Sequence, residues 1–411
     1  MTPKYRALSR VSLLAAATIF TLTASAQDWP QWRGANRDGG ATGFTEPASW
    51  PDALKQQWKV EIGLGYATPL LVGNRLYTFT RQGTEEVLQA LDAATGRSVW
   101  RTAYAAPFEM FAATAKHGPG PKSTPTFANG RIFTFGMSSI VTAFDAATGR
   151  QLWQKPKPAQ QPMFHTAMSP VVDGDRVIIH VGGPGDTGLV AYDVATGAER
   201  WKWSGDSPAY GSPVIAEFGG TRQVLLFTNQ NLVGVALATG QLLWQRPFTT
   251  PSNTTAQTPI IYKDSVIQAG RENGFTAFRV VRNGTAWSTE NTWRTDEASV
   301  HMSNSVVIDS VLYGLSHLNS GQYFALDLDS GQVLWKSQPR QAENAAIVKA
   351  GTTLFMLQND AQLVVLKANR SGFNPVKKYE VAMGETWAQP VVAGNRVFVK
   401  DVSNLTLWTL N

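Results

Sequence analysis

Ala90-Leu-Asp-Ala-Ala-Thr-Gly-Arg-Ser-Val-Trp100 is the stretch that decides the fold, because close copies of it recur along the chain. An apolar strand ends at an Asp, whose carboxylate can accept hydrogen bonds from backbone N–H groups about two residues on. The Gly supplies the positive φ of a tight turn, and a second strand then carries the Trp. Each copy therefore predicts a β-hairpin. The further copies begin at Ala143, Ala191, Val235 and Ala325.

A second marker alternates with these hairpins: a short polar residue, usually followed by Pro, precedes two apolar strands joined by a turn. It occurs eight times, at intervals of 41 to 46 residues with one interval of 56. The two markers together predict four antiparallel strands per repeat. This period is typical of a β-propeller, so we expect an all-β ring of eight four-stranded blades. Corresponding positions are Pro69, Pro125, Pro170, Pro213, Pro259, Ser305, Ala346 and Pro390.

The two ends of the chain complete one blade between them. After Pro390 the last repeat offers two strands and a third, at 405–410, and the sequence stops at Asn411. The missing fourth strand, with its aromatic residue Trp58, stands at 56–62. We therefore predict that an N-terminal strand closes the last blade and removes an open sheet edge.

Two hairpins depart from the repeat. The fifth has Asn283-Gly284 with Trp287 as its aromatic, and the seventh has Ser371-Gly372 with Tyr379. Both keep the Gly and lose the Asp, so we expect intact blades with weaker local pinning. Large aromatics mostly serve packing, so we assign the hairpin tryptophans to contacts between neighbouring blades. These residues are Trp58, Trp100, Trp153, Trp201, Trp244 and Trp335.

The first 26 residues predict a secretory signal peptide. Lys4, Arg6 and Arg10 precede an apolar run, and Ala24-Ser25-Ala26 forms an A-x-A cleavage site. The run is too short for a permanent membrane span. Residues 27–53 are turn-rich, and we interpret them as an extended arm before a propeller of residues 54–411. Trp29 and Trp32 could form a binding patch on this arm, or could pin the arm to the domain.

Charge and cysteine content narrow the class of protein. Removing the signal peptide lowers the formal net charge from +6 to +3, since it holds three basic and no acidic residues. No basic run indicates nucleic-acid binding. The chain has no Cys, which excludes disulfides, thiolate metal sites and a lipid-modified Cys after the signal. We expect an exported, soluble, monomeric protein of the periplasm or the extracellular space, without a lipid anchor.

The Asp-x-x-Thr-Gly-x-x-x-Trp hairpin resembles the tryptophan-docking motif of the PQQ-type eight-bladed propellers. That superfamily includes quinoprotein alcohol dehydrogenases and the outer-membrane assembly lipoprotein BamB, and the resemblance covers residues 54–411. The dehydrogenases imply a quinone on a Trp floor over the channel, a calcium ion, an Arg, an Asp base and, in many members, a disulfide. This chain has no Cys, has compact blades, and offers no Glu, Asn and Asp cluster to align with the calcium ligands. The resemblance to BamB implies a lipid anchor on a Cys, which we do not expect here because the sequence has no Cys.

Propeller geometry predicts where a site would lie. The loops before the inner strands and the turns after the second strands share one face, which we call the mouth face; the Thr-Gly turns occupy the opposite face, the underside. Three long loops, at 101–122, 154–168 and 245–257, belong to the mouth face. We therefore expect a ligand or partner site there. The candidate residues are Tyr66, Lys122, His165, Tyr210, Arg271, Glu272, His301, Glu343 and Trp387.

The favoured interpretation is a non-catalytic scaffold that binds a protein partner, an envelope polymer or a small ligand at the mouth face. We predict no catalytic residue, no metal and no cofactor. The alternative is a dehydrogenase of alcohols or sugars that uses PQQ with calcium at a divergent site. A hydrolase or lyase rests only on the proximity of His165 and His301. Convergence of carboxylates and Arg at the mouth face would favour an enzyme.

Overall fold

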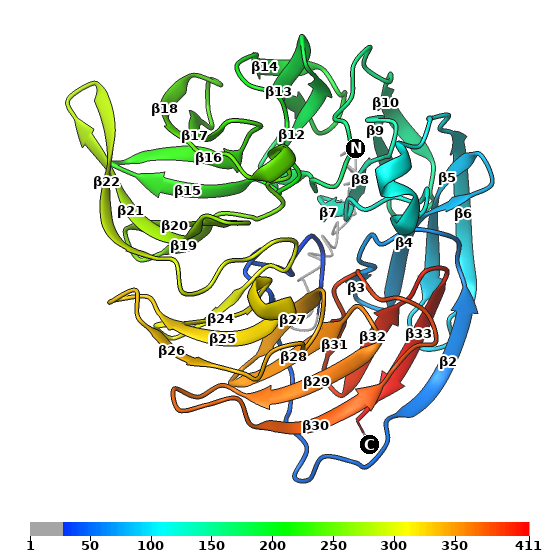
Figure 1. Ribbon diagram of the computed structural model, residues 1–411. Helices are drawn as coiled ribbons and strands as arrows, with labels where there is room; N and C mark the ends of the chain where they lie inside the picture. Colours follow the sequence, from blue (N-terminus) through cyan, green and yellow to red (C-terminus); the bar gives the residue numbers. More distant parts are fainter. Residues whose placement is uncertain (1–27, 411) are drawn as a thin grey trace, which may run out of the picture.

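The computed structural model describes residues 28–410, so the predicted signal peptide and Asn411 lie outside the described residues. Eight antiparallel four-stranded sheets stand around a central channel as an eight-bladed β-propeller (Figure 1). This confirms the predicted fold. Helix is confined to three short 3-10 segments, which are η1 (Ala112–His117), η2 (Pro251–Asn253) and η3 (Leu318–Ser320).

The first four blades follow the chain from the inner to the outer strand. Blades one and two are β3 (Leu70–Val72), β4 (Arg75–Gln82), β5 (Glu85–Asp92), β6 (Ser98–Ala105), and β7 (Thr126–Ala128), β8 (Arg131–Phe135), β9 (Val141–Asp145), β10 (Gln151–Lys155). Blades three and four are β11 (Val171–Asp173), β12 (Arg176–Gly183), β13 (Asp186–Asp193), β14 (Glu199–Trp203), and β15 (Val214–Phe218), β16 (Thr221–Phe227), β17 (Asn231–Ala236), β18 (Leu242–Pro247). The long mouth-face loops start later than expected, because the preceding strands β6, β10 and β18 extend to Ala105, Lys155 and Pro247.

The remaining blades repeat this order. Blades five and six are β19 (Ile260–Tyr262), β20 (Ser265–Gly270), β21 (Gly274–Asn283), β22 (Ala286–Thr295), and β23 (Val306–Ile308), β24 (Val311–Ser316), β25 (Gln322–Asp327), β26 (Val333–Lys336). Blades seven and eight are β27 (Ala345–Ala350), β28 (Thr353–Gln358), β29 (Gln362–Lys367), β30 (Pro375–Glu380), and β31 (Val391–Ala393), β32 (Arg396–Lys400), β33 (Asn404–Thr409), β2 (Lys55–Glu61). The antiparallel pairing of β2 with β33 confirms the predicted closure of the last blade.

The hairpin chemistry is as predicted. In the first copy the Asp92 carboxylate accepts hydrogen bonds from the N–H and the hydroxyl of Thr95, at 3.0 and 2.8 Å, and Gly96 has a φ of 70°. In the seventh blade Asn369 takes the place of the Asp, and its amide oxygen accepts the N–H groups of Ser371 and Gly372. The Asn amide therefore makes the same turn-stabilising hydrogen bonds as the Asp carboxylate, although we expected this turn to be less stabilised.

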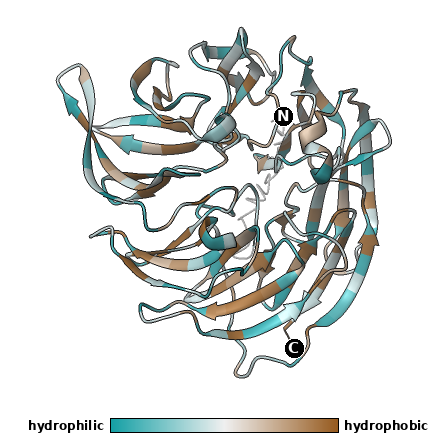
Figure 2. Ribbon diagram, viewed as in Figure 1, coloured by the Kyte–Doolittle hydropathy of each residue, from teal (hydrophilic) through white to brown (hydrophobic). Residues whose placement is uncertain are grey.

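Four of the predicted tryptophans, Trp58, Trp100, Trp153 and Trp201, pack on the turn Gly of the next blade. The Trp201 indole packs so closely on Gly240 of the next blade that a Cβ atom at position 240 would lie only 2.6 Å from the ring. The indole N–H donates to the Leu237 carbonyl at 3.0 Å. Trp58, Trp100, Trp153 and Trp335 donate to the next blade in the same way. Trp58 and Trp100 are only partly buried. Hydrophobic residues concentrate on the strands (Figure 2), and the apolar clusters extend across neighbouring sheets.

The aromatic of the fifth hairpin needs correction, and Trp244 contacts the next blade in a different way. Trp287 is not the docking residue of the fifth blade: Trp293 is, since it lies opposite Ala277 and donates to the Leu328 carbonyl at 2.8 Å. The β21–β22 hairpin is longer than its counterparts, which moves the aromatic farther from the Gly. Trp244 is buried but donates to Gln223 of its own blade at 2.7 Å. It meets the next blade at Phe278, because that blade offers no standard Thr-Gly turn.

The beginning of the arm enters the central channel. Residues 28–41, which we call the channel plug, form a compact series of turns that ends in β1 (Gly40–Ala41), and β1 pairs in parallel with β27. The plug is drawn in dark blue within the ring (Figure 1). Its backbone and side chains bond to residues in or beside the inner strands of several blades: Leu71, Phe127, Pro170, Thr258, Ser305 and Lys349. The N-terminal segment thus fills the channel that the blades enclose.

Candidate functional site

A cavity of about 430 Å³ opens at the mouth face. Its walls come from the loops before the inner strands, at the places where the sequence predicted a site. Six of the nine candidate residues line it: Tyr66, Lys122, Tyr210, Arg271, His301 and Trp387. Residues more than 300 positions apart thus meet in one cavity, because every inner strand starts at the same end of the channel.

Aromatic contacts build two opposite walls. On one side Phe164 lies 5.5 Å from Phe111 and 5.8 Å from Tyr210, and its N–H donates to the Tyr210 hydroxyl. On the other side Trp387 contacts His117 at 4.7 Å and Tyr66 at 6.4 Å between ring centroids. Segment η1 and the residue before it contribute to both walls. These contacts fix the loops and leave ring faces available for a ligand.

The cavity holds cations and no carboxylate. No Asp or Glu is among its lining residues, whereas Lys122 and Arg271 are, together with the imidazole rings of His117 and His301. Within residues 28–410 no hydrogen bond or ion pair holds the Lys122 ammonium, and burial lowers its pKa to about 8. Burial also lowers the pKa of His117 and His301, aided by Lys122 and Arg271 respectively. A ligand with negative charge would supply the counter-charge that the cavity lacks.

Three candidate residues lie outside the lining. His165 is buried beneath the loop, with its ring 4.9 Å from that of Phe108. Glu343 is exposed and forms an ion pair with Lys116 at 2.8 Å. Glu272 is also exposed and lies 3.6 Å from Arg271. Both carboxylates belong to the rim, so neither candidate carboxylate lies in the cavity, whereas the titratable side chains of Lys122, His117 and His301 do.

The sequence did not identify several lining residues. Trp32 of the channel plug reaches the cavity from the channel side, where its indole N–H donates to Thr258 Oγ1 at 3.3 Å. Asn304 and Asn344 also line it. The sequence also did not identify His117, which the folding of η1 places against Trp387. The pair Trp29 and Trp32 was the one available signal: Trp29 is fully buried in the channel, and Trp32 faces the site.

The lining residues do not fit the calcium ion of a quinoprotein. Calcium takes six to eight oxygen ligands, several of them carboxylates. The cavity offers only amide and hydroxyl oxygens, from side chains such as Asn304, Asn344 and Thr254. Among the described residues no three His, Asp and Glu side chains gather where they could hold a metal ion.

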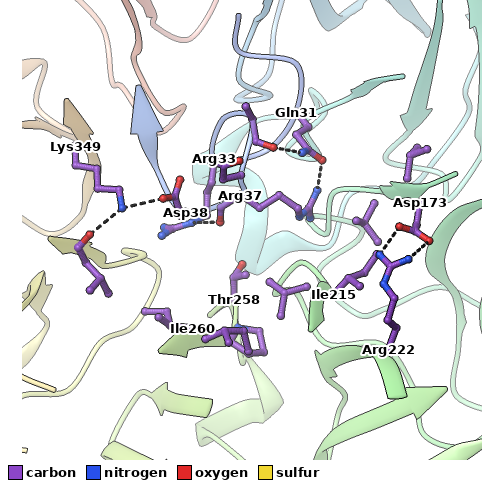
Figure 3. Close-up of a pocket in the computed structure, with 18 of the residues that line it drawn as sticks. Gln31, Arg33, Arg37, Asp38, Asp173, Ile215, Arg222, Thr258, Ile260 and Lys349 are labelled. Carbon is purple, nitrogen blue, oxygen red and sulfur yellow. Dashed lines mark hydrogen bonds and ion pairs between the residues drawn. The ribbon is translucent and has the colours of Figure 1, made fainter. Parts of the chain in front are cut away.

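A second cavity, of about 610 Å³, is lined by plug residues such as Arg33 and Arg37 together with residues of the inner strands (Figure 3). Its cations already have partners. Arg222 binds both carboxylate oxygens of Asp173, and Lys349 pairs with Asp38 at 2.8 Å. Arg33 and Arg37 donate to backbone carbonyls, including that of Ser305 at 2.6 Å for Arg33. We interpret this cavity as part of the plug's attachment to the inner strands.

The comparisons with known proteins decide the family. A family model described as "Outer membrane protein assembly factor BamB" matches residues 51–212 and 84–337. The chain belongs to this BamB family. BamB of Yersinia pestis is 25% identical over 324 residues, which cover 76% of this chain and 67% of that protein. A second BamB, from Burkholderia pseudomallei, is 24% identical and covers 75% of this chain and 86% of its own length.

Solved structures agree with the propeller fold. BamB from Moraxella catarrhalis superposes with a TM-score of 0.64 at 15% identity and covers 87% of this chain and all of its own. A quinohemoprotein alcohol dehydrogenase from Pseudomonas putida HK5 reaches a TM-score of 0.68, also at 15% identity, over 94% of this chain. At these identities the two likenesses show the fold alone. The BamB family match comes from the sequence.

Proposed function

We propose that this BamB-family protein is a non-catalytic binding propeller of the cell envelope, which presents its mouth face to a partner protein. The observation that carries the proposal is the mouth cavity, whose lining holds Lys122 and Arg271 and no carboxylate. An acidic side chain of the partner would neutralise Lys122, which has no counter-ion among residues 28–410. Truncating one partner of such a buried pair typically costs about 2–5 kcal/mol of binding free energy.

The names of the relatives support the direction of this proposal. The BamB proteins are outer membrane assembly factors by name, and they cover most of this chain. In the described residues no helix is both long and apolar enough to cross a membrane. With the predicted signal peptide, these observations favour an exported protein that acts by binding.

An acidic peptide tests the cationic cavity. The probe is a fluorescent, end-blocked peptide with the repeat Leu-Ser-Asp-Ser, which places Leu and Asp in turn on one face of an extended chain, and its control has Lys at every Asp position. We expect the acidic peptide to bind and Lys122→Gln to weaken it by at least about thirtyfold, which corresponds to about 2 kcal/mol. Lys116→Gln is the matched control, because it removes the same charge from the rim and leaves the lining intact. Equal binding of both peptides, or equal loss in both variants, would contradict the proposal.

The dehydrogenase alternative is tested separately. PQQ and calcium are titrated into the purified protein, and dye reduction is followed with alcohols and sugars. We expect no stoichiometric PQQ binding and no dye-linked oxidation, because the cavity offers calcium no carboxylate. Alcohol-dependent dye reduction that is lost on Arg271→Gln would establish the enzyme.

A further inference from the structure

The mouth face also carries an unusual set of exposed apolar side chains. Large hydrophobic residues that reach solvent within residues 28–410 are few, and most of them lie on the loops of this face. They include four methionines, each on a different loop: Met110 on 106–125, Met163 on 156–170, Met302 on 296–305 and Met383 on 381–390. The remaining described methionines, Met137, Met168 and Met356, are buried. Exposed methionine is therefore a property of this face.

Two of these side chains lie mostly in solvent. Met383 is 91% exposed and Met163 is 62% exposed. Phe111, 42% exposed, adds a ring beside Met110 and contacts Phe164 of the cavity wall. Of the four, Met302 also lines the cavity, so the apolar rim reaches the cationic site. We call Met110, Phe111, Met163, Met302 and Met383 the methionine rim.

Methionine suits a surface that must accept more than one sequence. Its side chain is unbranched and its sulfur polarizable, so it adapts to apolar groups of different shape. Promiscuous binders use such surfaces, which repack around each partner. A rigid, single partner would be matched better by branched and aromatic side chains of fixed rotamer. Four methionines from four loops thus indicate a variable apolar ligand that spans the mouth face.

We propose that the methionine rim binds extended polypeptide segments of variable sequence, which combine apolar side chains with an acidic residue. This inference rests on the proposed function, since the acidic residue enters the cavity at Lys122 while the flanking apolar side chains lie on the rim. Charge complementarity selects the occupant: the cavity beneath the rim has cations and no carboxylate among its lining residues. In an extended segment every second side chain points to the same face. One acidic side chain can therefore enter the cavity while the side chains two positions away on either side lie on the rim.

The test separates the rim from the cavity. The combined variant Met110→Ser, Met163→Ser, Met302→Ser and Met383→Ser is titrated with the Leu/Asp peptide and with a Ser/Asp peptide of the same charge. We expect the Kd for the Leu/Asp peptide to rise by about tenfold or more, and the Kd for the Ser/Asp peptide to change by less than about twofold. A second Leu/Asp peptide with its Leu residues changed to Val and Phe should bind within about threefold of the first.

The control variant removes exposed apolar side chains from elsewhere: Val99→Ser, Ile261→Ser and Val376→Ser, each on a strand outside the mouth-face loops. It should bind both peptides as the wild type does. An unchanged Kd in the rim variant would overturn the inference and leave the cavity proposal standing. If Lys122→Gln lost binding while the rim variant bound as the wild type does, the inference about the rim would likewise be overturned and the cavity proposal would stand.

Other occupants of the rim give distinct results. Concentration-dependent dimerisation that the rim substitutions abolish would assign the face to a second copy of this chain. Binding to vesicles of phosphatidylglycerol, lost in the rim variant and equal in strength to peptide binding, would assign it to a lipid surface. Either result would overturn the assignment to polypeptide. Circular dichroism and the unfolding midpoint of each variant verify that the substitutions leave the fold intact.

Discussion

Binding of an acidic ligand should weaken as the pH rises, because the charge of Lys122 is lost within the accessible range. Burial lowers the pKa of this lysine from 10.5 to about 8 in the free protein. Its ammonium is then about 90% protonated near pH 7 and about 10% protonated near pH 9. Only the protonated form can pair with a carboxylate, so the sign of the effect is a loss of affinity toward alkaline pH.

The magnitude follows from these fractions. If the bound carboxylate keeps Lys122 protonated throughout, the Kd for the Leu/Asp peptide rises about tenfold between pH 7 and pH 9. The other titrating groups of the cavity do not compensate. The pKa of His117 and that of His301 are lowered by burial, and that of Tyr66 is raised to about 12, also chiefly by burial. The end-blocked peptide stays fully ionised over this range.

Calorimetry in two buffers of different ionisation enthalpy measures the Kd at each pH and the number of protons taken up on binding. Near pH 8 the complex should take up about half a proton, and this uptake should vanish in Lys122→Gln. Lys122→Arg is the informative control, because a guanidinium stays charged and should give a flat profile. A flat profile in the wild type, or an unchanged slope in Lys122→Gln, would refute the reasoning that places this ammonium at the ligand.

Three further predictions concern the scaffold and the plug. Gly240→Ala should destabilise by about 1–3 kcal/mol more than Gly220→Ala in urea unfolding, since both have positive φ but only the first meets Trp201; equal costs would contradict the docking contact. Deleting Lys55–Glu61 should lower the unfolding midpoint of the whole ring, because β33 then becomes an open edge; unchanged melting would argue against closure. Trp32→Ala should weaken Leu/Asp peptide binding by about 1–3 kcal/mol, as loss of an aromatic wall, with little effect on peptide charge preference.

The channel plug takes part in both the scaffold and the candidate site. Trp29 packs in the channel against Leu71 of the first inner strand, and Trp32 reaches the mouth cavity from the channel side. The arm therefore contributes both to stability and to the lining of the candidate site. The Trp-rich composition of the arm made an attachment or a binding patch predictable. Its path through the channel could not be predicted, because it depends on contacts with blades far apart in the sequence.

The sequence by itself determined the architecture of this protein. Where a hairpin carries the Asp, the Thr and the Gly, these residues act within a few positions of one another, so the turn could be read directly from the sequence, as Asp92 and Gly96 show. The period then fixed eight blades, and the position of Trp58 fixed the closing strand. Six cavity residues were also predictable, because strand starts in a ring must converge.

Only the tertiary structure decided which side chains meet. Trp293 docks on the next blade, where Trp287 was expected to do so. The docking aromatic is the residue that pairs with Ala277 across the two strands, and its distance from the Gly in the sequence does not identify it. Glu343 turns to Lys116 on the rim, which leaves the cavity without its expected carboxylate. His117 and Trp32 reach the site through the fold of a loop and of the plug. Such placements depend on long-range packing, for which the local pattern of the chain carries no signal.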